Sequence, residues 1–268
     1  MGFRRMGCHD LLWIVRLFFL MQLVHVVFSW GKHGHYAVCK IAEGYLTKDA
    51  TATVKELLPD YANGELASVC SWPDDIKWYY RWYWTSPLHY VDTPSFKCNY
   101  NYGHNLTEAL IFLAHYMADV HQPLHVGFTG DLGGSILKVR WYRKKTNLHH
   151  VWDTLIIDTA VKTFYGSDLS TMVRAIQRNI TDAWSSDISS WNYCRHHKRV
   201  CPNQYAAESV RLACNFAYKN AKPGSILKDD YFLSRLPVVE KRLAQGGIRL
   251  AAVLNQLFNF EVKIGQSL

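Results

Sequence analysis

The chain has 268 residues, of which 49% are hydrophobic and 19% are charged. This length can bury a sizeable core, and the composition excludes global disorder. The formal net charge of +8 favours polyanionic partners, although a charge of this size also serves ordinary solubility. Aromatic residues are abundant, with 10 Trp, 16 Tyr and 12 Phe, and such residues fill cores or stack on unpaired bases.

The N-terminal segment has the features of a signal peptide. Two arginines precede an apolar run from Leu11 to Phe28, and Val27 and Ser29 are small residues suited to signal peptidase. We predict cleavage after Ser29, which removes residues 1–29 and leaves Trp30 as the mature N-terminus. The loss of three Arg and one Asp lowers the net charge from +8 to +6. An uncleaved membrane anchor is the alternative, but Arg16 leaves the apolar run short for a bilayer span.

The cysteines and sequons agree with a secretory route. Asn105-Leu-Thr and Asn179-Ile-Thr are glycosylation sequons. We therefore expect a secreted or vacuolar protein with no membrane association after cleavage. Six cysteines remain in the mature chain, an even number that suggests three disulfides in an oxidising compartment: Cys39, Cys70, Cys98, Cys194, Cys201 and Cys214.

Helical periodicity dominates the chain, without repeats or linkers, and predicts one all-α domain over residues 30–268. A glycine-rich loop, Gly127–Gly134, leads into Ile136–Tyr142, which has the alternation of a strand and predicts half of a short β-hairpin. Pro237 and Gly246-Gly247 are expected to interrupt the last helix. The predicted helices are Tyr36–Leu46, Ala50–Leu58, a helix capped by Asn105 and ended by Pro123, His149–Phe164, Leu169–Trp191, Gln204–Tyr218 and Asp230–Phe258.

Two helical pairs carry the chemistry. His115 and Asp119 are four residues apart, as are His149 and Asp153, so each pair shares one face of a helix. Imidazole and carboxylate groups are zinc ligands, and unpaired buried carboxylates are costly without a metal or a donor. Two such pairs on apolar helices predict a multi-metal hydrolase, and a set of solvated helix faces is the alternative.

Seven motifs resemble those of the single-strand-specific zinc nucleases of plants and fungi, the S-one/P-one nuclease family. The resemblance covers essentially all of residues 30–258. The similar stretches, in chain order, are WGKHGHYAVCKIAE from Trp30, WPDDIK from Trp72, LHYVDTP from Leu88, HYMADVHQPLHVGF from His115, GDLGG from Gly130, NLHHVWD from Asn147 and YFLSRLPVVEKRLAQGGIRLA from Tyr231.

This resemblance implies a mostly helical fold and three zinc ions. The third ion would use the free α-amino group of the mature N-terminus, so signal cleavage would also create a metal ligand. The ligands implied are Asp74, His89, His115 and Asp119 for the first zinc, His125, His149 and Asp153 for the second, and His35, bridging Asp119 and the amino nitrogen and carbonyl oxygen of Trp30 for the third.

The resemblance also implies that the substrates are single-stranded DNA, single-stranded RNA and nucleotides. It implies no stable protein partner. Asp74 and Asp119 would be catalytic through the metals, and Lys77 would stabilise the phosphate, unless it is a plain surface lysine. Tyr90 would stack on an unpaired base while Asp92 accepts a hydrogen bond from the edge of that base. Core packing is the alternative role for Tyr90, whereas His121 is interpreted as structural.

We predict three disulfides, Cys39–Cys70, Cys194–Cys201 and Cys98–Cys214. The sequence departs from the family in two places. Only Gly103 and His104 join two segments that the family separates by a longer stretch, which indicates an internal deletion near residues 102–105. Ser135 replaces an asparagine that usually follows the two glycines.

Two other functions stay open. Bacterial zinc phospholipases C share the three-zinc arrangement, although Tyr90 and Asp92 argue against a lipid head group. A catalytically weak zinc-binding isoform is the other alternative, and the missing segment favours it.

Overall fold

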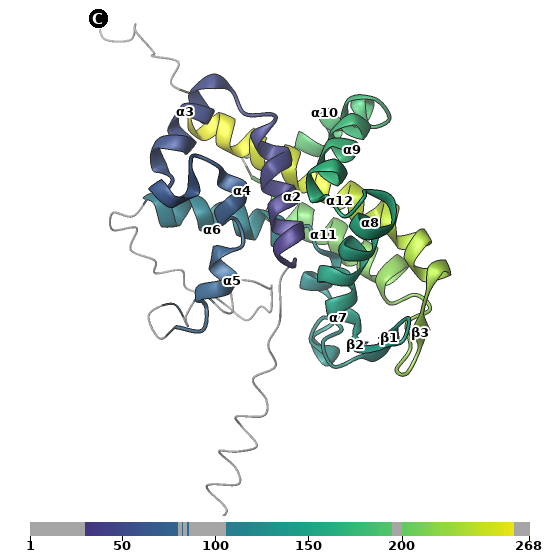
Figure 1. Cartoon of the computed structure of the whole chain (residues 1–268). Coiled ribbons are helices and arrows are strands. Elements are labelled where there is room, and N and C mark those ends of the chain that lie inside the picture. The colour runs from purple at the N-terminus through teal and green to yellow at the C-terminus, as the bar shows by residue number, and fades with distance from the viewer. Residues whose placement is uncertain (1–29, 80–81, 83–84, 86–105, 195–199, 260–268) are drawn as a thin grey trace, which may run out of the picture.

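The computed structural model describes residues 30–79, 82, 85, 106–194 and 200–259 (Figure 1). Most of these residues are helical, so the predicted mostly α-helical fold is confirmed. The helices are α2 (Lys32–Glu43), α3 (Lys48–Leu57), α4 (Leu66–Val69), α5 (Trp72–Ile76), α6 (Leu106–Asp119), α7 (Leu148–His150), α8 (Ile156–Phe164), α9 (Leu169–Thr181), α10 (Ile188–Asn192), α11 (Pro202–Leu212) and α12 (Asp229–Leu257).

Short turns of 3₁₀ and π geometry join several of these helices. The 3₁₀ turns are η1 (Asp60–Ala62), η3 (Pro123–Val126), η4 (Thr129–Asp131) and η6 (Ser185–Asp187). The π turns are η5 (Val151–Leu155) and η8 (Ala213–Ala217). The segment predicted as one helix over His149–Phe164 is therefore α7, η5 and α8 in direct succession.

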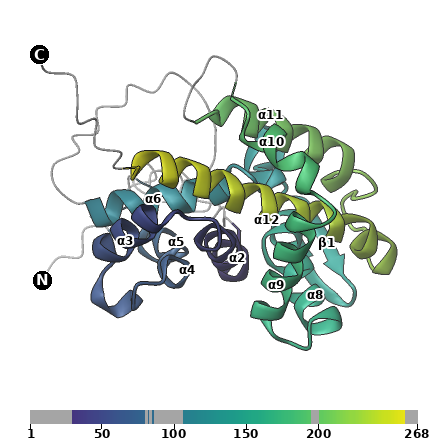
Figure 2. The same cartoon turned by 90° about the horizontal axis from the view of Figure 1, so that it is seen from above.

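Helix α12 runs through the middle of the molecule, with α2, α6, α8, α9 and α10 packed around it (Figures 1 and 2). The prediction that its glycines interrupt it is wrong, because α12 is continuous over 29 residues with Pro237 inside it. Gly246 and Gly247 instead allow α2 to approach closely. A Cβ atom at Gly247 would lie 2.5 Å from Ile41 Cγ2, so only glycine fits there.

The prediction of one helix over Leu169–Trp191 is also wrong. Helix α9 ends at Thr181, and α10 begins at Ile188 after the turn η6. The Thr181 hydroxyl group contacts both Arg178 O and Asp182 Oδ1 at the break. Such local side-chain hydrogen bonds compete with the helix ladder and favour a helix end.

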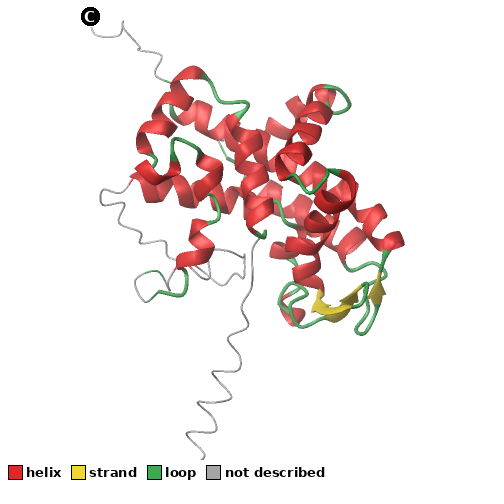
Figure 3. Ribbon diagram, viewed as in Figure 1, coloured by secondary structure: helices red, strands yellow, loops and turns green. Residues whose placement is uncertain are grey.

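The three strands found among the described residues form one small sheet at one end of the molecule (Figure 3). Strand β1 (Lys138–Trp141) pairs antiparallel with β2 (Lys144–Asn147), which confirms the predicted hairpin. The sequence did not predict β3 (Ile226–Leu227), which pairs parallel with β1. Val139 and Trp141 face the core, whereas Lys138 and Arg140 are exposed.

Two of the three predicted disulfides are present, Cys39–Cys70 and Cys194–Cys201. The first joins α2 to the residue that follows α4. Cys214 is exposed and is not bonded to any described cysteine, and its predicted partner Cys98 lies outside the described residues. Among the helices that the structure describes, none is both long and apolar enough to span a membrane.

Several predictions concern residues that the structure does not describe. The signal peptide, residues 1–29, is among them, and so is the helix cap at Asn105. The site residues in this group are His89, Tyr90 and Asp92. The assignment of residues 30–268 to one domain stays a prediction.

Candidate metal centre

Helix α6 provides the first half of the site. Its apolar residues anchor it in the core, and His115 and Asp119 project together from one face, with 0% and 3% of their surface exposed. His115 Nε2 lies 3.3 Å from Asp119 Oδ2. Burying polar side chains such as these is costly unless other groups or a metal ion interact with them, so the neighbouring helices should supply such groups.

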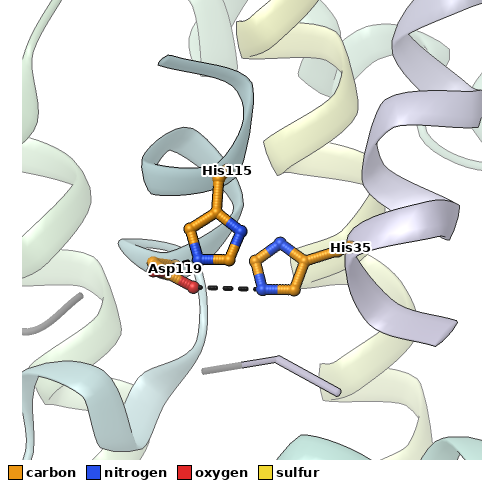
Figure 4. A group of neighbouring side chains, drawn as sticks. All are labelled: His35, His115 and Asp119. Atoms are coloured by element: carbon orange, nitrogen blue, oxygen red, sulfur yellow. Dashed lines mark ion pairs between the residues drawn. The ribbon is translucent and has the colours of Figure 1, made fainter. Parts of the chain in front are cut away.

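Helix α2 supplies one such group (Figure 4). His35 Nε2 lies 3.3 Å from Asp119 Oδ1, and the rings of His35 and His115 stack with centroids 3.9 Å apart. Asp74 on α5 completes this side of the site, with its carboxylate oxygens 3.7 Å from His35 Nε2 and 3.8 Å from His115 Nε2. Three helices that are distant in sequence thus converge on one cluster.

The second half of the site comes from η3, α7 and η5. His149 Nε2 lies 3.2 Å from Asp153 Oδ2, and His125 Nε2 lies 3.5 Å from Asp153 Oδ1. All three side chains are buried. His125 Nδ1 also lies 3.6 Å from Asp119 Oδ1, so the two halves meet at Asp119. The π turn at Asp153 is typical of functional sites.

The donor atoms fit a divalent metal. His35, His115 and Asp119 each offer a ligand atom within 4.8 Å of the others, and His125, His149 and Asp153 form a second such group. Nitrogen and carboxylate oxygen donors at this density are the ligand set that zinc prefers. The described residues therefore contain two adjacent groups that could each hold a metal ion.

Hydrogen bonds to the backbone orient two of the imidazole rings. His115 Nδ1 donates to Cys70 O and His149 Nδ1 donates to Gly133 O, both at 2.8 Å. A neutral ring that donates through Nδ1 keeps an unprotonated Nε2, and both Nε2 atoms face the carboxylates. This is the tautomer that a metal ligand requires.

The electrostatics of the carboxylates also favour a cation. Burial raises the pKa of the Asp153 carboxyl group well above its ordinary value. Burial acts in the same direction on Asp119, but its interactions with His115 and His125 outweigh it, so the pKa of Asp119 is lowered. A bound divalent cation would stabilise both groups as anions.

Lys77 is buried, with 3% of its surface exposed, which rules out the plain surface lysine. Its Nζ atom lies 2.8 Å from Asp74 Oδ1 and so faces the cluster. Burial acts against ionisation of the Asp74 carboxyl group, but its interactions with His115, His35 and Lys77 outweigh it and lower the pKa of that group.

Trp30 is fully buried at the start of α2. The next residue, Gly31, donates its backbone N–H to Asp153 O at 2.9 Å, and Gly31 O accepts from the backbone N–H of His35. The chain at Trp30 thus lies between two predicted ligands, His35 and Asp153. Its predicted role as a terminal chelate stays a prediction.

Gln122, which was not among the predicted site residues, is fully buried beside the cluster. Its Nε2 atom donates to Asp153 Oδ1, and its Oε1 atom accepts from Leu124 N. The sequence signal that could have indicated Gln122 is its position between His121 and His125, directly before Pro123. His121 contacts Met117 O and Arg249 Nη1, as a structural residue would.

The Ser135 side chain is buried, and its hydroxyl group makes no hydrogen bond with any described residue.

Comparison with known proteins identifies the family. Residues 30–106 and 97–259 match the S1/P1 nuclease family, which together is most of the chain. The chain belongs to the S1/P1 nuclease family. The nuclease predicted from the motifs is thereby confirmed.

Its relatives include Endonuclease 4 of Arabidopsis thaliana, with 52% identity over 94% of this chain and 96% of the relative. Endonuclease 3 of the same plant is 50% identical over 98% of this chain and its own whole length. Nuclease S1 of Aspergillus oryzae is 26% identical over 88% of this chain and 94% of its own length.

These comparisons agree with an internal deletion. The alignment with Endonuclease 4 spans 288 residues, which is longer than the 268 residues of this chain. The relative therefore has residues without a counterpart here. The family match also divides into two segments that meet at residues 97–106, where the sequence predicts the missing stretch.

Proposed function

We propose that this nuclease hydrolyses phosphodiester bonds in single-stranded DNA and RNA and also acts as a 3′-nucleotidase. The observation that carries the proposal is the buried cluster of two His/Asp groups, in which Asp119 of one group also lies 3.6 Å from His125 of the other. Such a cluster would hold closely spaced metal ions, which would stabilise the negative charge of a phosphodiester.

We assign zinc to this cluster, with three ions per chain. The first ion would be held by Asp74, His89, His115 and Asp119, the second by His125, His149 and Asp153, and the third by His35, Asp119 and the amino nitrogen and carbonyl oxygen of Trp30. The two groups of neighbouring ligand atoms support this assignment, His35, His115 and Asp119 on one side and His125, His149 and Asp153 on the other.

When bound, the zinc ions lower the pKa of a coordinated water molecule and neutralise charge on the phosphate. The protein supplies the orientation of the ligands. Carbonyl groups of Cys70 and Gly133 fix the rings of His115 and His149. Lys77 is held beside Asp74 and would place a positive charge against the phosphate. Tyr90 and Asp92 would bind the base.

Because base stacking requires an unpaired base, the proposal predicts a preference for single strands. The test compares cleavage of heat-denatured DNA, RNA and duplex DNA by the mature protein. Denatured DNA and RNA should be cleaved well and duplex DNA poorly. Equal cleavage of duplex and denatured DNA would contradict the proposed specificity.

A catalytically weak isoform is the second candidate, since the missing segment near residues 102–105 favours it. The missing segment contains none of the assigned ligands. Normal zinc content with little turnover of denatured DNA would support this candidate, whereas turnover with normal zinc content would reject it.

We also propose that the protein enters the secretory pathway and is secreted or vacuolar. Residues 1–29 would be removed, and Asn105 and Asn179 would be glycosylated. The two disulfides are compatible with an oxidising compartment. Sequencing the N-terminus of protein from the producing tissue tests the cleavage after Ser29.

A further inference from the structure

The outer face of the small sheet is strongly basic. Lys138 and Arg140 on β1 alternate with buried residues and point outward, and Lys145 on β2 lies directly opposite Arg140. We call these three residues the basic sheet face. Arg143 and Lys144, at the turn between the strands, are also exposed and extend the same charge.

This arrangement is electrostatically unfavourable for the protein alone. Arg140 and Lys145 are a directly opposed pair of like charges, and such pairs destabilise an antiparallel sheet. Among the described residues, no carboxylate lies within 4.0 Å of any of the five basic side chains at this hairpin. The repulsion is therefore relieved by solvent and by any anion that binds there.

The neighbouring carboxylates are engaged elsewhere. Asp131 accepts hydrogen bonds from Tyr218 and from the backbone N–H of Gly134. Asp158 pairs with His33, and Asp229 accepts from Tyr142. Because these three carboxylates interact with other residues, they do not pair with the basic side chains of the sheet face.

The basic sheet face is connected rigidly to the metal centre. Strand β2 runs directly into α7, where the Asn147 side chain accepts from His150 N and caps the helix that carries His149. On its inner side the sheet is anchored by Trp141, which contacts Phe232 and donates to Thr159. Figure 1 shows the sheet beside α7. These contacts fix the sheet relative to the helix that carries His149.

We propose that the basic sheet face binds the phosphate backbone of the single-stranded substrate beyond the bond that is cleaved. This inference rests on the proposed function. The bound chemistry is a run of phosphodiesters, recognised through charge and without base preference. Ile226 is the exposed apolar residue paired with Arg140, and one such side chain gives little to insert into a lipid surface.

The test uses Arg140→Gln/Lys145→Gln in the mature holoenzyme. The matched control is Lys48→Gln/Lys55→Gln, which removes the same charge from exposed positions on α3, at the opposite end of the molecule (Figures 1 and 2). Two substrates are compared, a long single-stranded DNA and a dinucleotide. The dinucleotide has a single phosphodiester group. That group must lie at the metal centre to be cleaved, so the dinucleotide has no further phosphate that could contact the basic sheet face.

The sheet variant should lose about tenfold in kcat/KM on the long strand at low salt. The log–log slope of KM against salt should fall by about 1.4, since each phosphate contact contributes about 0.7 for single strands. The dinucleotide should be cleaved at the wild-type rate, and the control should match the wild type on both substrates. Arg140→Lys, which keeps the charge, should retain the salt slope.

Unchanged kinetics on the long strand would overturn the inference while the proposed function stands. An equal loss on the dinucleotide would also overturn it, because the substitution would then act on the metal centre. Loss of binding to phosphatidylserine vesicles with unchanged kinetics would identify a lipid surface instead. A wild-type protein that cleaves neither substrate would overturn the proposed function and this inference with it.

Discussion

Asp119 is the side chain on which the two halves of the metal centre converge. Its Oδ1 atom lies near His35 Nε2 and His125 Nδ1, and its Oδ2 atom lies near His115 Nε2. Asp153 contacts only histidines of the second half among the described ion pairs. Asp119 is therefore suited to bridge two metals, whereas Asp153 would serve one in the proposed arrangement.

We expect Asp119→Asn to lose more zinc than Asp153→Asn. A bridging carboxylate offsets repulsion between two dications, and an amide removes that charge. Activity on denatured DNA should fall further in Asp119→Asn for the same reason. Metal analysis of the two purified variants checks the prediction, and equal zinc loss would contradict the bridging role.

Gln122 acts on the site through Asp153. Removing the amide in Gln122→Ala takes away the hydrogen bond that orients Asp153 Oδ1. Loss of such support typically lowers metal affinity about 10- to 100-fold. Gln204→Ala is the control, since Gln204 donates to Tyr193 O at the surface. Competition with a chromophoric chelator measures both affinities, and equal values would show that Gln122 does not support the metal.

At the scale of elements, the disulfide Cys39–Cys70 joins two parts of the centre. Cys39 lies on α2 one turn after His35, and Cys70 O accepts the hydrogen bond that orients His115. The disulfide Cys194–Cys201 instead closes a short segment, with a sequence separation of 7, that contains no predicted ligand. The first bond therefore constrains a longer loop and a functional element.

We expect Cys39→Ser/Cys70→Ser to destabilise the protein more than Cys194→Ser/Cys201→Ser. The sequence separations are 31 and 7, which correspond to about 4 and about 2.5 kcal/mol of lost loop-closure entropy. Denaturant unfolding under non-reducing conditions measures the two losses. A larger loss for the second pair would contradict this ranking.

The sequence predicted the elements that follow strong periodicity and missed those that tertiary contacts create. His115 and Asp119 were found because the helix places positions four apart on one face. Gly246 and Gly247 predicted a break because glycine disfavours isolated helices, yet close packing on α2 decides their structure. Strand β3 and the role of Gln122 depend on partners distant in sequence, which a local pattern does not contain.

At the scale of the whole molecule, the mature N-terminus is part of the proposed centre. An added methionine before Trp30 would turn its amine into an amide nitrogen, which has no lone pair available for a metal. Zinc should fall from about three towards two ions per chain, and activity should fall with it. The helices and disulfides should survive, since they do not depend on that amine. Zinc analysis of protein starting at Trp30 and at Met-Trp30 makes the comparison, and equal zinc and equal rates would refute the terminal chelate.

The buried His/Asp cluster is proposed to hold the metal ions that cleave single-stranded nucleic acid. The most direct measurement removes metal from the mature protein with a chelator and then titrates zinc back while activity on denatured DNA is followed. We predict that activity disappears with the metal and returns as about three zinc ions bind per chain. Full activity in metal-free protein, or zinc binding that restores none, would contradict the account.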